Sequence, residues 1–180
     1  MISLASSFRV TLLLLLATAS WASPTAYFSS EDDLQSRIVK TLDRCQTSLE
    51  IALYEFSSPR LTQAVERAAE RGVFVRVLLD ATPSRTSVKN NRFPNLEVRY
   101  LQGRRAGAMH HKFAVLDNQE LMTGSFNWTR AAQYMNHENI IFEDDGGIVL
   151  AYSRQFEDLW RQARHRPASF HHRREPVRHE

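Results

Sequence analysis

Apolar positions along the chain follow two different spacings. Short apolar or alternating runs are typical of strands, and longer stretches with apolar residues three and four apart are typical of helices. The strand pattern covers 48–56, 73–79, 96–101, 112–117, 120–123 and 138–143, and the helix pattern covers 30–44, 58–71, 129–135 and 147–164. This alternation of strands and helices predicts an α/β sandwich.

The boundaries of these segments carry local signals. Ser30 is the expected N-cap of the first helix, Ser58 and Pro59 open the second helix, and Gly72 closes it. Strand 48–56 has apolar residues on both faces, so we expect helices to cover both of its sides. The connecting segments are predicted to be a short lead-in at 24–29, a surface excursion at 80–94 and a flexible basic loop at 102–108.

The two ends of the chain differ in composition from its centre. Residues 1–22 have the pattern of a secretory signal peptide, in which Arg9 precedes a leucine-rich run and small residues lead to Ala22. The run is shorter than the roughly 20 apolar residues of a membrane-spanning helix, so we expect no stable membrane anchor. The expected folded domain is 23–164, and the basic His/Arg-rich tail 165–180 is expected to be disordered.

The net charge of +3 is unevenly distributed. Residues 164–180 carry five arginines and two glutamates, whereas 23–163 carry 17 basic and 18 acidic residues. Total charge therefore does not argue for a nucleic-acid partner. The pair Arg104 and Arg105, which lies just before the central motif, is the better indication.

Cys45 is the only cysteine, so an intramolecular disulfide is excluded. It lies on the apolar face of the first predicted helix, which favours a buried, inert thiol over a reactive one. An intermolecular disulfide stays open in an oxidising compartment. The tail histidines favour a solvated tail over a loose metal site; they are His165, His171, His172 and His179.

Residues 109–128 gather side chains that suit a phosphate. An imidazole can act as nucleophile or proton donor near neutral pH, and an ammonium attracts phosphate oxygens. A hydroxyl and an amide donate hydrogen bonds, and a glycine lets backbone approach a ligand closely. These residues are His110, Lys112, Gly124, Ser125 and Asn127.

A predicted hairpin brings these groups together. Residues two apart on a strand share a face, so His110 and Lys112 point the same way. Asp117 and Asn118 form the turn, and the returning strand carries Ser125 and the residues after it back toward the start of the first strand.

The spacing His-x-Lys-x4-Asp-x6-Gly-Ser-x-Asn, which starts at His110, resembles the signature of the phospholipase D superfamily at every fixed position. The chain is most similar to the small branch with one motif per chain, typified by bacterial periplasmic or secreted nonspecific endonucleases. The likeness runs from about residue 30 to residue 160 and includes 54–57, 71–73 and 136–139. It implies a mixed β-sheet between helices, with the site at one edge.

The resemblance also implies roles for the motif residues. His110 attacks phosphorus and forms a phosphohistidine, which water then hydrolyses. Lys112 and Asn127 bind the phosphate and stabilise its charge, and Ser125 and Gly124 add substrate contacts. No metal and no other cofactor is expected.

Four further residues complete the predicted site. The resemblance gives Asp117 a structural supporting role. A carboxylate is needed to orient the nucleophilic imidazole, and Glu138 lies where the family carries one. Arg104 and Arg105 are predicted to contact the substrate.

The reaction needs a second imidazole to protonate the leaving oxygen. His111 should point to the opposite face of its strand, and His137 is a minor candidate. The resemblance implies a homodimer in which two motifs face each other, with Trp128 and the residues around Asn127 at the seam.

The predicted function is that of a metal-independent endonuclease on DNA or RNA, periplasmic or secreted. The first alternative is a phospholipase D or cardiolipin hydrolase, which is disfavoured because no amphipathic membrane-surface helix is evident. The second is a non-catalytic nucleic-acid-binding module, which is disfavoured because every motif position is intact.

Overall fold

The protein is an α/β sandwich built on one mixed sheet. The computed structural model describes residues 24–82, 86, 88–89 and 92–165. The strands are β1 (Thr25–Phe28), β2 (Ser48–Leu53), β3 (Phe74–Asp80), β4 (Leu96–Leu101), β5 (Lys112–Leu116), β6 (Glu120–Gly124) and β7 (Asn139–Glu143). The helices are α1 (Leu34–Arg44), α2 (Pro59–Glu70), α3 (Arg130–Tyr134) and α4 (Gly146–Gln162), with a 3₁₀ turn η1 (Arg104–Ala106).

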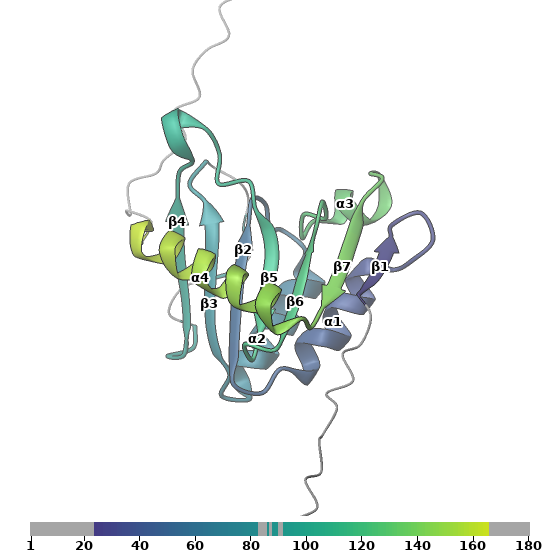
Figure 1. The fold of residues 1–180 in the computed structure, drawn as a ribbon, viewed down its shortest axis with the longest axis horizontal. Helices are drawn as coiled ribbons and strands as arrows, with labels where there is room; N and C mark the ends of the chain where they lie inside the picture. Colours follow the sequence, from purple (N-terminus) through teal and green to yellow (C-terminus); the bar gives the residue numbers. More distant parts are fainter. Residues whose placement is uncertain (1–23, 83–85, 87, 90–91, 166–180) are drawn as a thin grey trace, which may run out of the picture.

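The sheet has the strand order β1-β7-β6-β5-β2-β3-β4. Strands β2, β3 and β4 are parallel, and each remaining neighbour pair is antiparallel. Helices α1 and α2 lie on one face, and α4 crosses the other face (Figure 1). The predicted mixed sheet between helices is confirmed.

Two apolar clusters fill the spaces on either side of the sheet. Leu49, Ile51 and Leu53 of β2 pack in the cluster on the side of α1 and α2. Ala52, on the opposite face of β2, packs with Phe156 of α4. The prediction that both faces of this strand are covered is thus confirmed, and the burial explains its nearly continuous apolar sequence.

A charged cluster lies under α4. The guanidinium of Arg76 on β3 bonds the carboxylates of Glu50 on β2 and Glu157 on α4. The Cζ atom of Arg76 lies 5.1 Å from the ring centre of Phe156 and 5.5 Å from that of Trp160. Burial raises the pKa of Glu50, although the charge and hydrogen bond of Arg76 act in the opposite direction. Through Arg76, this cluster links α4 to strands β2 and β3 of the sheet.

Two local predictions were wrong. Residues 24–29 are not merely a lead-in, because Thr25–Phe28 forms β1 and pairs with β7 at the edge of the sheet. The N-cap of α1 is Asp33 rather than Ser30, because the carboxylate of Asp33 accepts from the amide of Ser36 at 2.9 Å. Ser58 caps α2 as predicted.

The predicted signal peptide 1–22 lies outside the described residues, and so does the predicted tail except for His165. In the described part of the chain, no helix has the length and apolarity needed to cross a membrane. Cys45 is 3% exposed, and burial is the main cause that raises the pKa of its thiol to about 12. The inert thiol predicted from the sequence agrees with this environment.

Candidate active site

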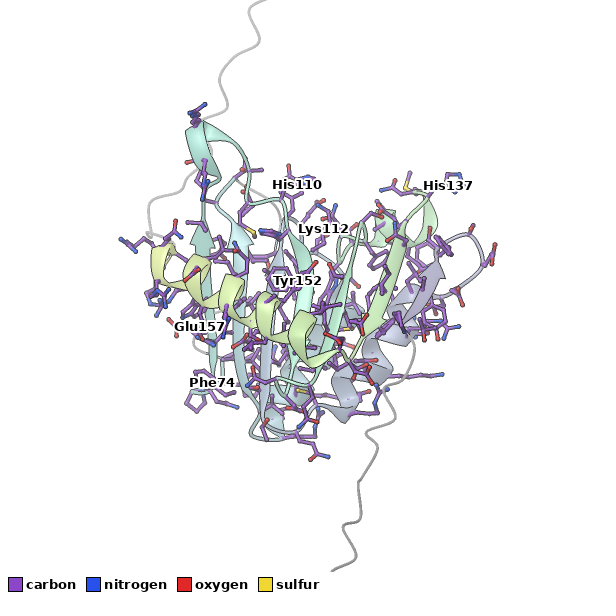
Figure 2. The ribbon with its side chains drawn as sticks, in the orientation of Figure 1. Phe74, His110, Lys112, His137, Tyr152 and Glu157 are labelled. Carbon is purple, nitrogen blue, oxygen red and sulfur yellow. The ribbon has the colours of Figure 1, made fainter. Side chains whose placement is uncertain are left out.

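The motif residues lie at one edge of the sheet. Parallel strands β2 and β3 end there, and β5 begins there, with Lys112 paired to Leu53 at the end of β2. Figure 2 shows His110 and Lys112 together at this edge. The carboxyl ends of parallel strands are the usual ligand-binding edge of an α/β sheet.

His110 and Lys112 are in direct contact. The Nζ atom of Lys112 lies 3.1 Å from Nδ1 of His110 and donates to the backbone oxygen of His110 at 3.0 Å. An ammonium can only donate, so the facing imidazole nitrogen presents a lone pair. The exposed imidazole and the ammonium are therefore directed at the same small volume.

Tyr54 forms a wall of this site and was not predicted to belong to it. Its ring centre lies 4.4 Å from that of His110 and 5.2 Å from Nζ of Lys112. Its amide donates to the backbone oxygen of His111 at 2.8 Å, which continues the pairing of β2 with β5. The position of Tyr54 directly after β2 could have indicated that it lies at this edge of the sheet.

The ammonium of Lys112 is partly withdrawn from water. Burial is the main cause that lowers the pKa of Lys112, and the negative charge of Glu138 acts in the opposite direction. A charge in a less polar environment attracts an anion more strongly than the same charge in bulk water. This environment suits a phosphate-binding lysine.

Ser125 and Glu138 form a hydrogen-bonded pair beside the lysine. The hydroxyl of Ser125 donates to Glu138 and accepts from the amide of Asn139 at 3.1 Å. The other carboxylate oxygen of Glu138 accepts from the side chain of Asn136 at 3.0 Å. Glu138 was expected to orient the imidazole of His110, but within the described protomer its carboxylate bonds Ser125 and Asn136 instead.

Asn127 holds a buried amide oxygen that has no hydrogen-bond partner among the described residues. Leaving a buried acceptor unsatisfied costs about 1–3 kcal/mol. Such unsatisfied groups are therefore rare and often mark a site where a ligand binds. The next residue, Trp128, is 3% exposed and packs edge-on against Phe56 with ring centres 5.0 Å apart. The ring of Trp128 therefore belongs to the core of the protomer, and the dimer seam around Asn127 stays a prediction.

Gly124 ends β6 where the backbone of β7 passes closely. A Cβ atom at this position would lie 2.3 Å from the backbone oxygen of Asn139 and 2.8 Å from its side-chain oxygen. The close approach requires glycine and sets the spacing between Ser125 and the segment that carries Glu138.

Asp117 lies at the opposite end of β5 from the site. Five residue steps along a strand separate it from Lys112, which is about 16 Å. Its carboxylate accepts from the amides of Gln46, Thr47 and Ser48 and from the hydroxyl of Thr47. Burial acts to raise the pKa of Asp117, but these hydrogen bonds lower it to about 2. Asp117 thus fixes the loop that leads into β2.

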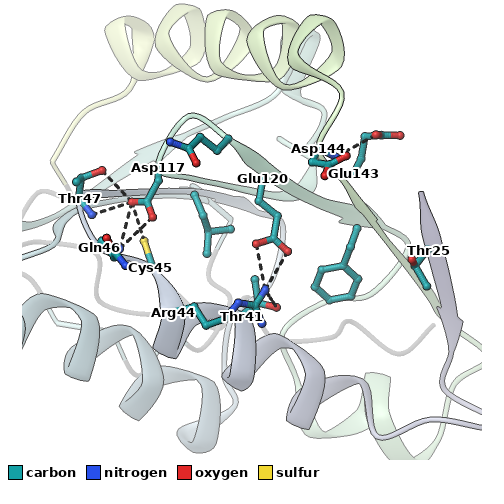
Figure 3. Close-up of a pocket in the computed structure, with 13 residues that line it drawn as sticks. Thr25, Thr41, Arg44, Cys45, Gln46, Thr47, Asp117, Glu120, Glu143 and Asp144 are labelled. Atoms are coloured by element: carbon teal, nitrogen blue, oxygen red, sulfur yellow. Dashed lines mark hydrogen bonds and ion pairs between the residues drawn. The ribbon is translucent and has the colours of Figure 1, made fainter. Parts of the chain in front are cut away.

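The hollow of about 620 Å³ around Asp117 is separate from the motif edge. Figure 3 shows its carboxylate bonded to the loop after α1, with the ion pair of Arg44 and Glu120 nearby. The imidazole and lysine of the motif do not reach this hollow, so we place the chemistry at the other end of the strand.

Asp80 holds the chain immediately before His110. It ends β3, is 1% exposed, and accepts from the amide of Met109 at 2.5 Å. Its other oxygen accepts from the amide of Thr82 at 2.8 Å. No sequence pattern indicated this contact, because it depends on how the loop crosses the end of β3.

The basic loop before the motif is a closed turn rather than an open loop. Gln102 and Ala108 form a bridge, and Arg105 has a φ of 53° within η1. Arg104 and Arg105 are exposed. Arg104, but not Arg105, borders a groove beside His110.

The two other candidate histidines form no hydrogen bond with His110 in the described part of the chain. The ring of His111 packs edge-on against Phe113, and His111 borders the same groove as His110. Burial is the main cause that lowers the pKa of His111, with the charges of Lys112 and His110 adding to it. His137 is exposed and lies away from His110 along the edge (Figure 2).

A groove runs from His110 toward α4. It has a volume of about 550 Å³ and lies between the loop 102–111 and the C-terminal half of α4. We call it the α4 groove. It is bounded by Gln102, Arg104, His110, Gln155, Arg161 and Gln162, among others.

A mixed sheet between helices, with an imidazole and a lysine at the ends of its parallel strands, defines a phospholipase D/nuclease fold. Residues 38–160 match the family described as cardiolipin synthase, PLD-like domain. The chain therefore belongs to this family, within the phospholipase D superfamily of phosphodiesterases, and the resemblance inferred from the motif is confirmed.

Named relatives agree with this membership. The mitochondrial cardiolipin hydrolase of Xenopus tropicalis is 42% identical over 142 residues, which are 77% of this chain and 66% of that protein. The human protein of the same name is 38% identical over 130 residues, which are 71% of this chain and 51% of that protein. The chain thus spans between half and two thirds of the length of these relatives.

Solved structures share the fold over nearly their whole length. Nuc from Salmonella typhimurium, a phospholipase D family member, is 25% identical with a TM-score of 0.71, covering 81% of this chain and 99% of that one. NucT from Helicobacter pylori is 22% identical with a TM-score of 0.70, covering 78% and 96%.

Proposed function

We propose that the protein is a metal-independent phosphodiesterase that cleaves nucleic acid through a phosphohistidine at His110. The contact of 3.1 Å between Lys112 Nζ and the imidazole of His110 carries this proposal. A phosphate that enters between them would accept from the ammonium and release the imidazole lone pair for attack. The side-chain NH2 of Asn127 would add a neutral donor for a phosphate oxygen.

The reaction has two steps. The imidazole nitrogen of His110 forms a bond to phosphorus while the bond to the leaving oxygen breaks, and that oxygen takes a proton from a second imidazole. Water then attacks phosphorus, the phosphorus–nitrogen bond breaks, and the second imidazole takes the proton of the water. Lys112 stabilises the charge on the equatorial oxygens in both steps.

We propose that the second imidazole comes from His110 of a second copy of the chain. His111 borders the α4 groove with His110 but packs its ring against Phe113, and His137 lies away along the edge. Sedimentation equilibrium should therefore give a dimer. A monomer with full activity would contradict this part of the proposal.

The α4 groove supports nucleic acid as the substrate class. Amide and guanidinium groups along it suit a phosphate-bearing polymer better than acyl chains. The pattern of residues 1–22 supports a periplasmic or secreted enzyme. Cardiolipin is the second candidate substrate, since the 42% identity to a cardiolipin hydrolase favours it.

The test is cleavage in excess EDTA. We expect the protein to cut single-stranded DNA, RNA or plasmid without metal, and we expect His110→Ala to lose this activity entirely. His137→Ala is the matched control, since it removes an exposed histidine at the same edge and should cleave normally. The wild-type protein should also trap an acid-labile phosphoryl group, which His110→Ala should not.

Three outcomes contradict the proposal. Cleavage that requires an added divalent metal would refute the phosphohistidine mechanism. Hydrolysis of cardiolipin vesicles without cleavage of any nucleic acid would replace the substrate with the second candidate. Nucleic-acid binding without turnover of either substrate would indicate a binding module.

A further inference from the structure

The α4 groove opens directly at the proposed nucleophile. His110 is part of its border, and the groove extends from there along the C-terminal half of α4. Its volume of about 550 Å³ falls in the roughly 300–1,000 Å³ range of small-ligand sites. Residues 155–162 of a helix span about 10 Å at 1.5 Å per residue. A unit of nucleotide size can therefore lie in the groove while its neighbouring phosphate lies at His110.

The polar lining of the groove offers mainly hydrogen-bond donors. Arg161 has a side chain that is 70% exposed, and one of its five donor hydrogens is directed to Asp158. Gln162 donates to the backbone oxygen of Asp158 at 2.8 Å. Arg104 has no carboxylate partner within the part of the chain that the structure describes. The guanidinium groups of Arg104 and Arg161 together outweigh the single carboxylate of Asp158.

Several other arginines of the described chain are already paired with carboxylates. Arg92 pairs with Glu66 at 2.8 Å, and Arg99 pairs with Glu97 at 2.7 Å. Among the described residues, Arg104 on η1 has no such carboxylate partner, and Arg161 on α4 pairs only with the exposed Asp158 beside it. Both sides of the α4 groove therefore carry a guanidinium next to His110.

We infer that the α4 groove binds the nucleotide next to the scissile phosphodiester, and that Arg104 and Arg161 bind the phosphate of that nucleotide from the two sides of the groove. Gln155 and Gln162 supply neutral donors and acceptors, which suit ribose and base edges without selecting one base. The inference rests on the proposed nuclease activity and adds the outer face of α4 to its substrate site.

The experiment compares two substrates on the full chain. Bis(4-nitrophenyl) phosphate is a diester without a neighbouring nucleotide, and a labelled single-stranded oligonucleotide has neighbours on both sides. We expect Arg161→Ala to raise the KM for the oligonucleotide about fivefold, as for an exposed ion pair of about 1 kcal/mol. Turnover of bis(4-nitrophenyl) phosphate should be unchanged.

The matched control is Arg154→Ala. Arg154 is exposed on the same helix and carries the same charge, but it does not border the groove. The salt dependence separates the two variants further. Loss of one phosphate contact to a single strand lowers the slope of log affinity against log salt by about 0.7, which we expect for Arg161→Ala and not for Arg154→Ala.

Equal KM values for Arg161→Ala and Arg154→Ala on the oligonucleotide would overturn the inference. An equal loss on bis(4-nitrophenyl) phosphate would also overturn it, because Arg161 would then act on the nucleophile rather than on a neighbouring nucleotide. A wild-type protein that cleaves no oligonucleotide would refute the proposed function and this inference together. The inference alone fails when the wild type cleaves and Arg161→Ala cleaves equally well.

Discussion

Replacing Asp117 by asparagine should destabilise the protein without removing its chemistry. The hydrogen bonds from residues 46–48 outweigh burial and lower the pKa of Asp117 from 3.8 to about 2. One pKa unit corresponds to about 1.4 kcal/mol, so the charged carboxylate contributes about 2 kcal/mol to folding at pH 7. Asp117→Asn removes that charge and should lower the free energy of unfolding by this amount.

The stabilisation by Asp117 should decrease as the pH falls. A carboxyl group with a depressed pKa in the folded state stabilises fully above its unfolded value near 3.8, and this contribution disappears as pH falls through about 2. The difference between wild type and Asp117→Asn should therefore be largest at pH 7, roughly half as large at pH 3, and small at pH 2.

Urea unfolding followed by tryptophan fluorescence at pH 7, 4 and 3 measures this difference. Asp144→Asn is the control, because Asp144 borders the same hollow and is exposed. A difference that is independent of pH, or one below about 0.5 kcal/mol at pH 7, would refute the reasoning. A folded Asp117→Asn protein with a strongly reduced kcat would show that the distance of about 16 Å from Lys112 does not isolate Asp117 from the reaction.

Gly124→Ala should lower both the thermal midpoint and the activity, because the added methyl group forces β6 away from β7 at a cost of about 1–3 kcal/mol. Gly146→Ala is the control, since its methyl group meets no atom within 4 Å and should leave both quantities unchanged. Equal thermal midpoints for the two variants would refute the steric argument. Because burial lowers the pKa of Lys112, the alkaline fall in kcat/KM should begin below the pKa of 10.5 for a free lysine, as the ammonium loses its proton. Any activity that remains in Lys112→Arg should lack that alkaline fall. If the wild type and Lys112→Arg both show the fall in kcat/KM, a group other than Lys112 causes it. Asp80→Asn should reduce kcat about tenfold with little change in KM, because a misplaced nucleophile affects the reaction more than binding; a folded variant with normal kcat would remove Asp80 from this positioning role.

The motif spacing was sufficient to predict which side chains meet. His110 and Lys112 are two apart on an extended segment, so local geometry alone brings them together. A three-residue turn, 117–119, then carries the chain back along β6 to Ser125. Asp117 and Asn118 both have positive φ values, near 53°, as their turn requires. These contacts depend on near neighbours in the sequence.

Contacts between distant segments could not be predicted in this way. The carboxylate of Glu138 was assigned to His110 by position, whereas within the described protomer it bonds Ser125 and Asn136. Arg161 and Gln155 lie on the outer side of α4, opposite the apolar stripe that faces the core. From the sequence alone, polar residues at such positions predict only exposure to solvent. Strand β1 has four mostly exposed residues and no apolar alternation, so its pairing with β7 left no pattern to detect.

The first strand has a consequence for where a transplantable unit of this fold begins. Ser29, just after β1, donates its hydroxyl to the backbone oxygen of Asn136 at 2.8 Å and accepts from the amide of Glu138 at 2.9 Å. Its own amide donates to the backbone oxygen of Glu138 at 2.9 Å. The family match starts at residue 38, beyond these three bonds. A chimera cut at the family boundary would keep every motif residue but release the segment that holds Glu138, so exchange between relatives should include the chain from Thr25 onward.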